Sequence, residues 1–466
     1  MSRSIWRSAA LVSAGLAAAA LVAAASAPAV AAPPHAPVAP QKSSHVLGSP
    51  QLFVKAPDTD GVKQVLQLAK TRDVKNALAL TKVLATPQAV WLTSGTPAQV
   101  RKTVQQTIVA ATIERAVPVF VAYNVPGRDC GSYSAGGAQT TAAYEAWIDG
   151  IAAGIGNAKA AILVEPDGLG LLPGSNCGVT PKDPADATRF AQLQYAVDAL
   201  EAKPNTSVYL DATHPAWLNV GDITKRLISA GVNDAQGFFT NVSNFQYTVN
   251  DVDYGTWISD CIALVNAGET TADNCYNQYW NGGPNTGWSG VALDPYSQWQ
   301  STDPSQLSSY AGDVTGRYNT DLATAGVTPT AHFVVDTSRN GTGPNSMATY
   351  GSAPYNQSAA TVSTLVAGNW CNPPGAGLGL RPTTKTGNPL VDAYVWAKTP
   401  GESDGQCDAA GGARAWDFSA YTQPGWPADA TAQAQFDPLW GLNDPAAGAW
   451  FPAQTLDLIK HATPAL

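Results

Sequence analysis

Residues 161–170 read AILVEPDGLG, and residues 121–137 read VAYNVPGRDCGSYSAGG. Each stretch begins as an apolar run, reaches an acidic residue, Asp167 or Asp129, and then breaks into glycine. In parallel α/β sheets, chemistry takes place at the edge where the strands end. A carboxylate in the loop that follows a buried strand lies at that edge. Two such carboxylates in one chain predict acid–base catalysis.

Short apolar runs alternate with helical patterns along the chain. We expect strands at 51–54, 89–92, 117–123, 160–164, 207–211, 237–242, 332–336 and 391–397. Helices are expected at 96–116, where Thr96 to Gln99 form a capping box, and at 140–155, 187–202, 222–230 and 358–367. Repeating strand–helix units imply a parallel sheet, so the predicted fold is α/β, a distorted seven- or eight-stranded parallel β/α barrel with long mouth loops.

Polar side chains follow these strands repeatedly. They are Asp129, Asp167, Asp211, Asn241, Asp336 and Asp404. In a β/α barrel the carboxyl ends of all strands face one mouth, which predicts that these side chains gather there. Acidic residues also cap the helices that follow strands, and on that alternative two or three of the six are structural.

The N-terminus has the pattern of a secretory signal peptide at 1–32, with Arg3 and Arg7, an apolar run and a small-residue cleavage site. An uncleaved membrane anchor is the alternative. Residues 33–50 contain five prolines and predict a short tether, followed by one catalytic domain at 51–466. We therefore expect a secreted, extracellular protein with no membrane segment in its mature form.

The formal net charge is −9, and it becomes −11 without the first 32 residues, which hold two arginines and no acids. This acidic balance argues against a nucleic-acid partner and against binding to anionic lipid. A neutral polymer remains compatible as a substrate.

The chain has six cysteines, which in an exported protein favour three disulfides over metal ligands. Fifteen pairings are possible, and pairing of neighbours is the simplest: Cys130–Cys177, Cys261–Cys275 and Cys371–Cys407. The five histidines are scattered and no metal-binding spacing occurs, so neither a metal nor another cofactor is expected.

Several ordered motifs between about 117 and 405 resemble glycoside hydrolase family 6, the inverting β-1,4-glucanases that act on cellulose. They are Val121, Tyr123, Pro126, Arg128, Asp129 and Cys130 with 134–137; Glu165-Pro166-Asp167; 209–212 with His214 and Trp217; 240–244; 336–341; 370–375; and Lys398 with 401–405. The partner implied by this resemblance is a β-1,4-glucan polysaccharide, bound by a monomeric enzyme.

The resemblance implies catalytic roles. Asp167 would be the general acid, which requires a raised pKa. Asp129 could raise that pKa and help to hold the attacking water. Asp404 would be the base, with Asp129 as the other candidate, and inversion requires the acid and base carboxyls to lie about 6.5–9.5 Å apart. The structural alternative for Asp404 is an ion pair with Arg339 or Lys398.

The resemblance also implies contacts with sugar. Trp217 and Trp370 would stack on sugar faces, and Tyr123 would lie under the distorted ring. Hydroxyl groups would be bound by His214, Asn241, Lys398 and Glu402. For His214 and Asn241 the alternative is a structural polar group. The pairs Cys130–Cys177 and Cys371–Cys407 would brace catalytic loops, whereas Cys261–Cys275 lies in an added segment.

Some features depart from the family pattern. No aromatic residue follows Phe53 before Leu68, so the far glycone subsite lacks its usual platform. The long stretch 406–443 and the ending at 445–451 favour a chain-end-acting cellobiohydrolase. The alternatives are an open-cleft endoglucanase and a catalytically inactive glucan-binding protein.

Overall fold

The computed structural model describes residues 46–48, 51–180, 182–279, 292–299, 312–409 and 413–466. All of them belong to one compact unit. The strands are β1 Val90–Leu92, β2 Val119–Ala122, β3 Ala160–Val164, β4 Thr206–Asp211, β5 Gly237–Thr240, β6 His332–Asp336 and β7 Val391–Val395. The helices are α1 Thr59–Lys70, α2 Val74–Leu84, α3 Pro97–Glu114, α4 Thr141–Ile155, α5 Lys182–Glu201, α6 Val220–Ser229, α7 Thr248–Asn266, α8 Gly312–Ala325, α9 Ala359–Ala367, α10 Ala430–Ala434 and α11 Pro452–Lys460.

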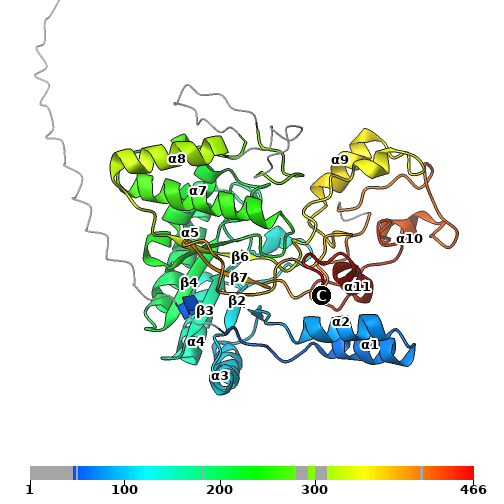
Figure 1. The fold of residues 1–466 in the computed structure, drawn as a ribbon, viewed down its shortest axis with the longest axis horizontal. Coiled ribbons are helices and arrows are strands. Elements are labelled where there is room, and N and C mark those ends of the chain that lie inside the picture. The colour runs from blue at the N-terminus through cyan, green and yellow to red at the C-terminus, as the bar shows by residue number, and fades with distance from the viewer. Residues whose placement is uncertain (1–45, 49–50, 181, 280–291, 300–311, 410–412) are drawn as a thin grey trace, which may run out of the picture. The chain divides into compact units, whose positions relative to one another are not determined.

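Within the described ranges, seven parallel strands form one curled sheet in chain order, β1 to β7 (Figure 1). Each strand pairs with the next along the chain, as in the register Val121–Leu163 between β2 and β3. The predicted α/β class and the seven-strand option are confirmed. An eighth strand at 51–54 was wrong, because that segment makes only a single bridge, between Leu52 and Val117.

The sheet does not close through a ladder between β7 and β1. Where its two edges approach, the amide of Ala89 donates to the carbonyl of Trp396 at 3.0 Å, and the indole of Trp91 donates to the carbonyl of Ala397 at 2.7 Å. We call this junction the seam.

Alternate residues of the strands serve two cores, because successive side chains of a strand point to opposite faces. The outer set packs under the helices and includes Phe120, Ile162, Val208, Leu210, Phe238 and Phe333. The inner set fills the curl of the sheet and includes Val121, Leu163, Tyr209, Phe239 and Val334. By the same parity Tyr123, Asp211, Asn241 and Asp336, at the carboxyl ends, fall on the inner side.

The predicted helices are found, and the capping box at Thr96 and Gln99 is present. Helix α4 packs closely against α3 at two glycines. A Cβ at Gly150 would lie 2.5 Å from the Pro97 carbonyl oxygen, and a Cβ at Gly154 would lie 2.8 Å from Val104 Cβ. Helices α1, α2, α7, α8, α10 and α11 had not been expected. Among the described residues, no helix combines the length and the apolar character needed to span a bilayer.

The predicted signal peptide at 1–32 and most of the predicted tether at 33–50 lie outside the described residues. Residues 46–48, at the end of that tether, form a short 3-10 turn whose Val46 and Leu47 are buried in the inner core. The Val46 amide donates to the hydroxyl of Ser207 at 3.1 Å, which fixes this turn to the start of β4.

Candidate active site

Residues directly after the strands adopt backbone conformations that side chains rarely accept. Asp129, Glu165, Asp167, Thr213 and Asn241 all have φ between 53° and 66°. A non-glycine residue in this left-handed region costs of order 1–3 kcal/mol, and such residues cluster at functional sites. The strain is concentrated at the carboxyl edge of the sheet, which marks that edge as the site.

Asp167 follows β3 at this edge. Its surroundings are buried while the residue itself is partly exposed. Burial raises its pKa well above the ordinary range, and the nearby carboxylates of Asp211, Asp129 and Asp404 raise it further. This shift favours the protonated form of Asp167, which is the form that can donate a proton.

Asp211 ends β4 and is the strongest of these electrostatic neighbours. Only 4% of it is exposed, its Oδ1 accepts the amide of Thr213 at 3.0 Å, and burial raises its pKa to about 7. The sequence placed Asp211 at the mouth but assigned it no role beside Asp167.

Asp129 starts a short 3-10 turn, Asp129–Gly131, after β2. Its Oδ2 accepts the amide of Ser134 at 2.6 Å. Burial raises its pKa, although that hydrogen bond and Arg128 act in the opposite direction. The neighbouring Cys130 is bonded to Cys177, so the loops after β2 and β3 are joined covalently. The other two bonds are Cys261–Cys275 and Cys371–Cys407, so all three join neighbouring cysteines.

Glu165, two residues before Asp167, is fully buried; the sequence placed it in the Glu165-Pro166-Asp167 motif but assigned it no role. Both of its carboxylate oxygens lie 2.9 Å from the amide nitrogen of Asn124, and Oε2 also accepts the amide of Val125 at 3.0 Å. Burial raises its pKa to about 7. This side chain fixes the end of β2 against the end of β3, and therefore Asp129 against Asp167.

Asp404 lies on the far side of the cluster, after β7. Its Oδ2 contacts Arg339 Nη1 at 2.5 Å and its Oδ1 contacts Lys398 Nζ at 2.9 Å, and 8% of the residue is exposed. Burial opposes ionisation, but the two cations hold the pKa of Asp404 below its ordinary value. The ion pair considered from the sequence is present, and Asp404 pairs with Arg339 and Lys398 together. These pairs favour the anion of Asp404, which lies close enough to Asp167 to raise its pKa.

Tyr123 and Trp91 lie edge to face, with ring centroids 5.5 Å apart, and the Arg128 guanidinium carbon lies 4.5 Å from the Tyr123 ring centroid. Burial raises the pKa of Tyr123, and Asp167 and Asp129 raise it further, so Tyr123 remains a neutral phenol.

His214 follows β4. Its Nδ1 accepts the amide of Ala216 at 3.3 Å, and burial lowers its pKa to about 3. The ring is therefore neutral, with its proton on Nε2. The His214 and Trp217 ring centroids lie 5.8 Å apart. Trp217 rests on Gly170, where a Cβ would lie 2.4 Å from the indole.

Two residues predicted to contact sugar are engaged within the protein. The amide nitrogen of Asn241 donates to the carbonyl of Asp336 and to Oδ1 of Asn340, both at 2.8 Å, and its Oδ1 accepts the amide of Gln246 at 3.1 Å. Asn241 is 0% exposed, which favours the structural alternative for it. Lys398 also donates to the carbonyl of Ser403 at 3.2 Å.

Asp336, predicted at the mouth, is a scaffold residue. It is fully buried and accepts the amides of Ser243, Ser338, Ala397 and Lys398 at 2.9–3.2 Å. Trp370 is 38% exposed beside Tyr133, with ring centroids 5.9 Å apart, and Glu402 is partly exposed.

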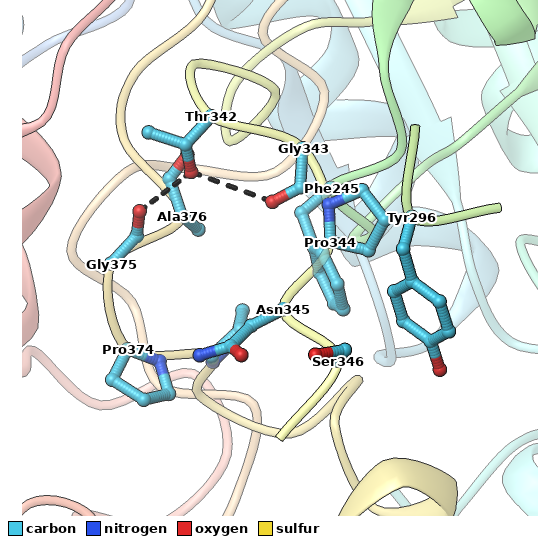
Figure 2. Close-up of a pocket in the computed structure, with 11 residues that line it drawn as sticks. Phe245, Tyr296, Thr342, Gly343, Pro344, Asn345, Ser346, Pro374, Gly375 and Ala376 are labelled. Atoms are coloured by element: carbon cyan, nitrogen blue, oxygen red, sulfur yellow. Dashed lines mark hydrogen bonds between the residues drawn. The ribbon is translucent and has the colours of Figure 1, made fainter. Parts of the chain in front are cut away.

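A pocket of about 370 Å³ lies between the loop after β6 and the segment that follows Asn372 (Figure 2). Pro374, Asn345, Ser346 and Tyr296 stand around it, and its lining carries no charged side chain. None of the predicted site residues lines this pocket, so it is a neutral hollow separate from the carboxylates.

The fold and the site together define a class of protein. Several carboxyl groups lie at the carboxyl edge of a parallel α/β sheet, and their pKa values are shifted in opposite directions. Hydrolases that use acid–base catalysis have this arrangement. The family model for glycosyl hydrolases family 6 matches residues 48–462. The chain therefore belongs to this family.

Curated relatives carry two kinds of name. Endoglucanase A of Thermobispora bispora is 30% identical over 369 residues, which are 79% of this chain and 60% of that protein. A probable 1,4-β-D-glucan cellobiohydrolase C of Aspergillus terreus is 30% identical over 370 residues, 74% of this chain and 60% of the relative. The chain thus spans about 60% of the length of these relatives.

Among solved structures, the endoglucanase Cel6 of Mycobacterium tuberculosis, in complex with methyl-cellobiosyl-4-deoxy-4-thio-β-D-cellobioside, is 30% identical, with a TM-score of 0.57. The match covers 90% of this chain and 99% of that one. The catalytic core of the cellobiohydrolase Cel6A of Chaetomium thermophilum shares the fold at 24% identity and a TM-score of 0.56, over 91% and 100% of the two chains.

Proposed function

We propose that this protein hydrolyses β-1,4-glucan with inversion at the anomeric carbon. The observation that carries the proposal is the contrast between Asp167, whose pKa is raised well above the ordinary value, and Asp404, whose pKa is lowered, in one electrostatically connected cluster. Two carboxyl groups driven apart in pKa are the requirement for acid and base roles at one bond.

In the proposed reaction Asp167 gives its proton to the departing glycosidic oxygen as the bond from that oxygen to the anomeric carbon breaks. Water adds to the opposite face of the anomeric carbon and loses a proton towards Asp404 or Asp129. The lowered pKa of Asp404 makes it the weaker base of the two, whereas the pKa of Asp129 is raised. Both therefore remain candidates.

The proposed sugar contacts are the faces of Trp217 and Trp370, the ring of Tyr123, and the Nε2 proton of His214. Glu402 and Lys398 would bind hydroxyl groups near Asp404. A cello-oligosaccharide analogue bound to the Mycobacterium tuberculosis relative supports a β-1,4-glucan as the ligand.

The decisive experiment is Asp167→Asn, measured on phosphoric-acid-swollen cellulose and on cellohexaose. We expect turnover to fall by about 10²–10⁴-fold with binding retained, since a positioned general acid supplies a factor of that order. Asp260→Asn is a suitable control, because Asp260 is a buried carboxyl on α7 whose pKa burial raises to about 7. Near-normal turnover of Asp167→Asn would remove it from the acid role.

Product stereochemistry tests inversion separately. Fresh product from the wild-type protein should carry the α configuration at the new reducing end, and β product would exclude inversion. No sugar release at any pH would instead support a glucan-binding protein without activity.

For the mode of attack we propose release of cellobiose from chain ends, supported by the long segment after Asp404 that Cys371–Cys407 ties to the loop carrying Trp370. Internal cleavage is the alternative, favoured by the endoglucanase names of relatives at 30% identity. A rapid viscosity loss of soluble cellulose with little soluble sugar would establish the endo mode.

We also propose secretion as a monomer after removal of residues 1–32. N-terminal sequencing of the protein from culture supernatant, together with size-exclusion chromatography, tests both points.

A further inference from the structure

Asn372 and Asp404 hold one another through two reciprocal hydrogen bonds. The backbone amide of Asn372 donates to Asp404 Oδ2 at 2.8 Å, and the backbone amide of Asp404 donates to Asn372 Oδ1 at 2.8 Å. Both residues are buried. Asn372 has φ 40° and follows the disulfide-bonded Cys371, so its unusual backbone conformation is fixed from one side by a covalent bond.

The other end of the Asn372 amide fixes which way it points. Its Nδ2 donates to Asp444 Oδ2 at 2.7 Å and to the carbonyl of Gly405 at 3.0 Å, while Oδ1 also receives Gln454 Nε2 at 3.2 Å. If the Asn372 amide were flipped, its Nδ2 would face the backbone N–H of Asp404, which is also a donor. Its Oδ1 would face Asp444 Oδ2, which is also an acceptor. The orientation of Asn372 therefore depends on Asp444.

Asp444 belongs to a buried pair with Asp437. Arg414 Nε contacts Asp437 Oδ2 at 2.9 Å, and both of these side chains are 0% exposed. One oxygen of each carboxyl and Cys407 Sγ all lie within 4.8 Å of one another. Cys407 is bonded to Cys371 and cannot act as a thiolate, so this cluster is better explained by a shared proton than by a metal ion.

Arg414 faces the two buried carboxyl groups of Asp437 and Asp444. If both were ionised, two buried anions would share this one cation, which is unfavourable. Arg414 stabilises the anion of Asp437. Burial, the charge of Asp437 and the hydrogen bond to it raise the pKa of Asp444 to about 8, despite the opposing effects of Asn372 and Arg414. Asp444 thus keeps its proton at neutral pH.

We propose that Asn372 and the Asp437–Asp444 pair form a positioning unit that orients Asp404, and that loss of the shared proton in alkali loosens this orientation because the two buried carboxylates then repel one another. The inference rests on the proposed function, because it assumes that Asp404 acts in the reaction. Asn372, Asp437 and Asp444 are positioning residues that act through Asp404. None of them is among the residues predicted from the sequence to be catalytic.

Different charged groups face Asp444 and Asp404. Asp444 faces Asp437 and Arg414. Asp404 faces Arg339 and Lys398, and Asp167 lies within its electrostatic reach. Alkaline loss of activity therefore has two sources, ionisation of the acid Asp167 and ionisation of Asp444, and only the second belongs to this proposal.

A double-mutant cycle on cellohexaose tests the first half of the proposal. Asn372→Ala should lower kcat by about 10–100-fold with KM changed by less than about threefold, since misplacement of a reacting group costs that much. In an Asp404→Asn background the same change should have no further effect, because Asn372 acts only through Asp404. An equal loss in both backgrounds, or kcat unchanged by Asn372→Ala alone, would overturn the positioning role.

The pH profile of Asp444→Asn tests the second half without removing a hydrogen-bonding group. Its amide replaces the protonated acid, so kcat at pH 6 should stay within about threefold of wild type and the alkaline limb should move up by about half a pH unit or become shallower. Asp260→Asn, the buried control, should leave the limb in place. An alkaline limb of Asp444→Asn identical to that of wild type refutes the proton-sharing role.

These outcomes separate the two proposals. If Asp404→Asn keeps wild-type turnover, the assignment of Asp404 fails, and the positioning role fails with it. If Asp404→Asn loses turnover while the Asn372 and Asp444 variants behave as wild type, the proposed function stands and only the positioning unit is rejected. Urea unfolding of each variant verifies that it is folded under assay conditions.

Discussion

At the scale of single residues, the candidate site gives similar side chains different partners, which shift their pKa values in opposite directions. Asp167, Asp211, Asp129 and Asp404 share one edge of the sheet, yet burial and like charge favour the acid form of Asp167 while Arg339 and Lys398 favour the anion of Asp404. The partners of each carboxyl group, more than its residue type, decide its chemistry.

Asp211→Asn should shift the alkaline limb of activity to lower pH. Asp211 is the first electrostatic cause of the raised Asp167 pKa, so its removal lowers that pKa and Asp167 loses its proton earlier. The measurement is kcat on cellohexaose between pH 4 and 10. A limb that stays in place would show that Asp211 does not contribute to the raised pKa of Asp167.

Gly170→Ala should weaken substrate binding with little effect on the chemical step. The added Cβ would lie 2.4 Å from the Trp217 indole, so the ring has to move from its resting place. We expect KM for cellohexaose to rise by about 5–50-fold, the loss of about 1–2 kcal/mol of stacking, with kcat nearly unchanged. The reverse pattern, a loss confined to kcat, would argue against Trp217 as a sugar platform.

The sequence could predict which carboxyl groups gather around Asp167 but not the residues that hold them in place. Asp129, Asp167 and Asp404 stand in recognisable motifs at strand ends. Glu165 and Asn372 lie in the same motifs, but their roles depend on contacts with Asn124 and Asp444, which lie 41 and 72 positions away in the chain. No local pattern indicates such partners.

At the scale of elements, strands were easier to predict than helices. Buried parallel strands are continuous apolar runs, and all seven strands begin within two residues of their expected positions. Helices α1 and α7 were missed for different reasons. The apolar residues of α1 do follow the 3.6-residue period, so the sequence carried the signal for this helix. Helix α7 buries polar residues such as Asn250 and Asp251, which blurs that period.

Glu165→Ala should destabilise the junction of β2 and β3. The buried amides of Asn124 and Val125 would lose their acceptor, which costs about 2–4 kcal/mol in the free energy of unfolding together with the lost packing. Urea denaturation measures this loss. Glu165→Gln keeps the shape and one acceptor oxygen, so its effect should be smaller, and equal losses for the two variants would contradict the hydrogen-bond explanation.

At the scale of the whole molecule, several buried groups make stability depend on pH. Glu165, Asp211 and Asp444 have pKa values raised by burial to about 7, 7 and 8, whereas their unfolded values lie near 4. The unfolded chain therefore releases protons that the native state retains as pH rises from about 4 to about 8, and the native state loses stability across that window. The His332 pKa is also raised, mainly by its hydrogen bond to Asp392, so His332 acts in the same direction above pH 6.5.

Asp404 acts at the opposite end of the pH scale. Its pKa is lowered, so its ion pairs stabilise the protein above pH 4 and are lost as pH falls below that value. We expect maximal stability near pH 4–6. Urea unfolding at pH 3, 5, 7 and 9 checks this, and a protein more stable at pH 9 than at pH 5 would contradict the assignment of protonated buried acids.

The seam has a consequence for the spacing between the carboxyl groups at the two margins of the sheet. Asp129 and Asp167 are carried by β2 and β3, near one margin of the curled sheet, while Asp404 follows β7 at the other margin. No hydrogen-bonded ladder spans this junction, so the width across it is governed by loops and by contacts such as that of Trp91 with Ala397. Changes in these loops, by evolution or by design, can therefore alter the spacing between Asp167 and Asp404 and leave all seven strands in register.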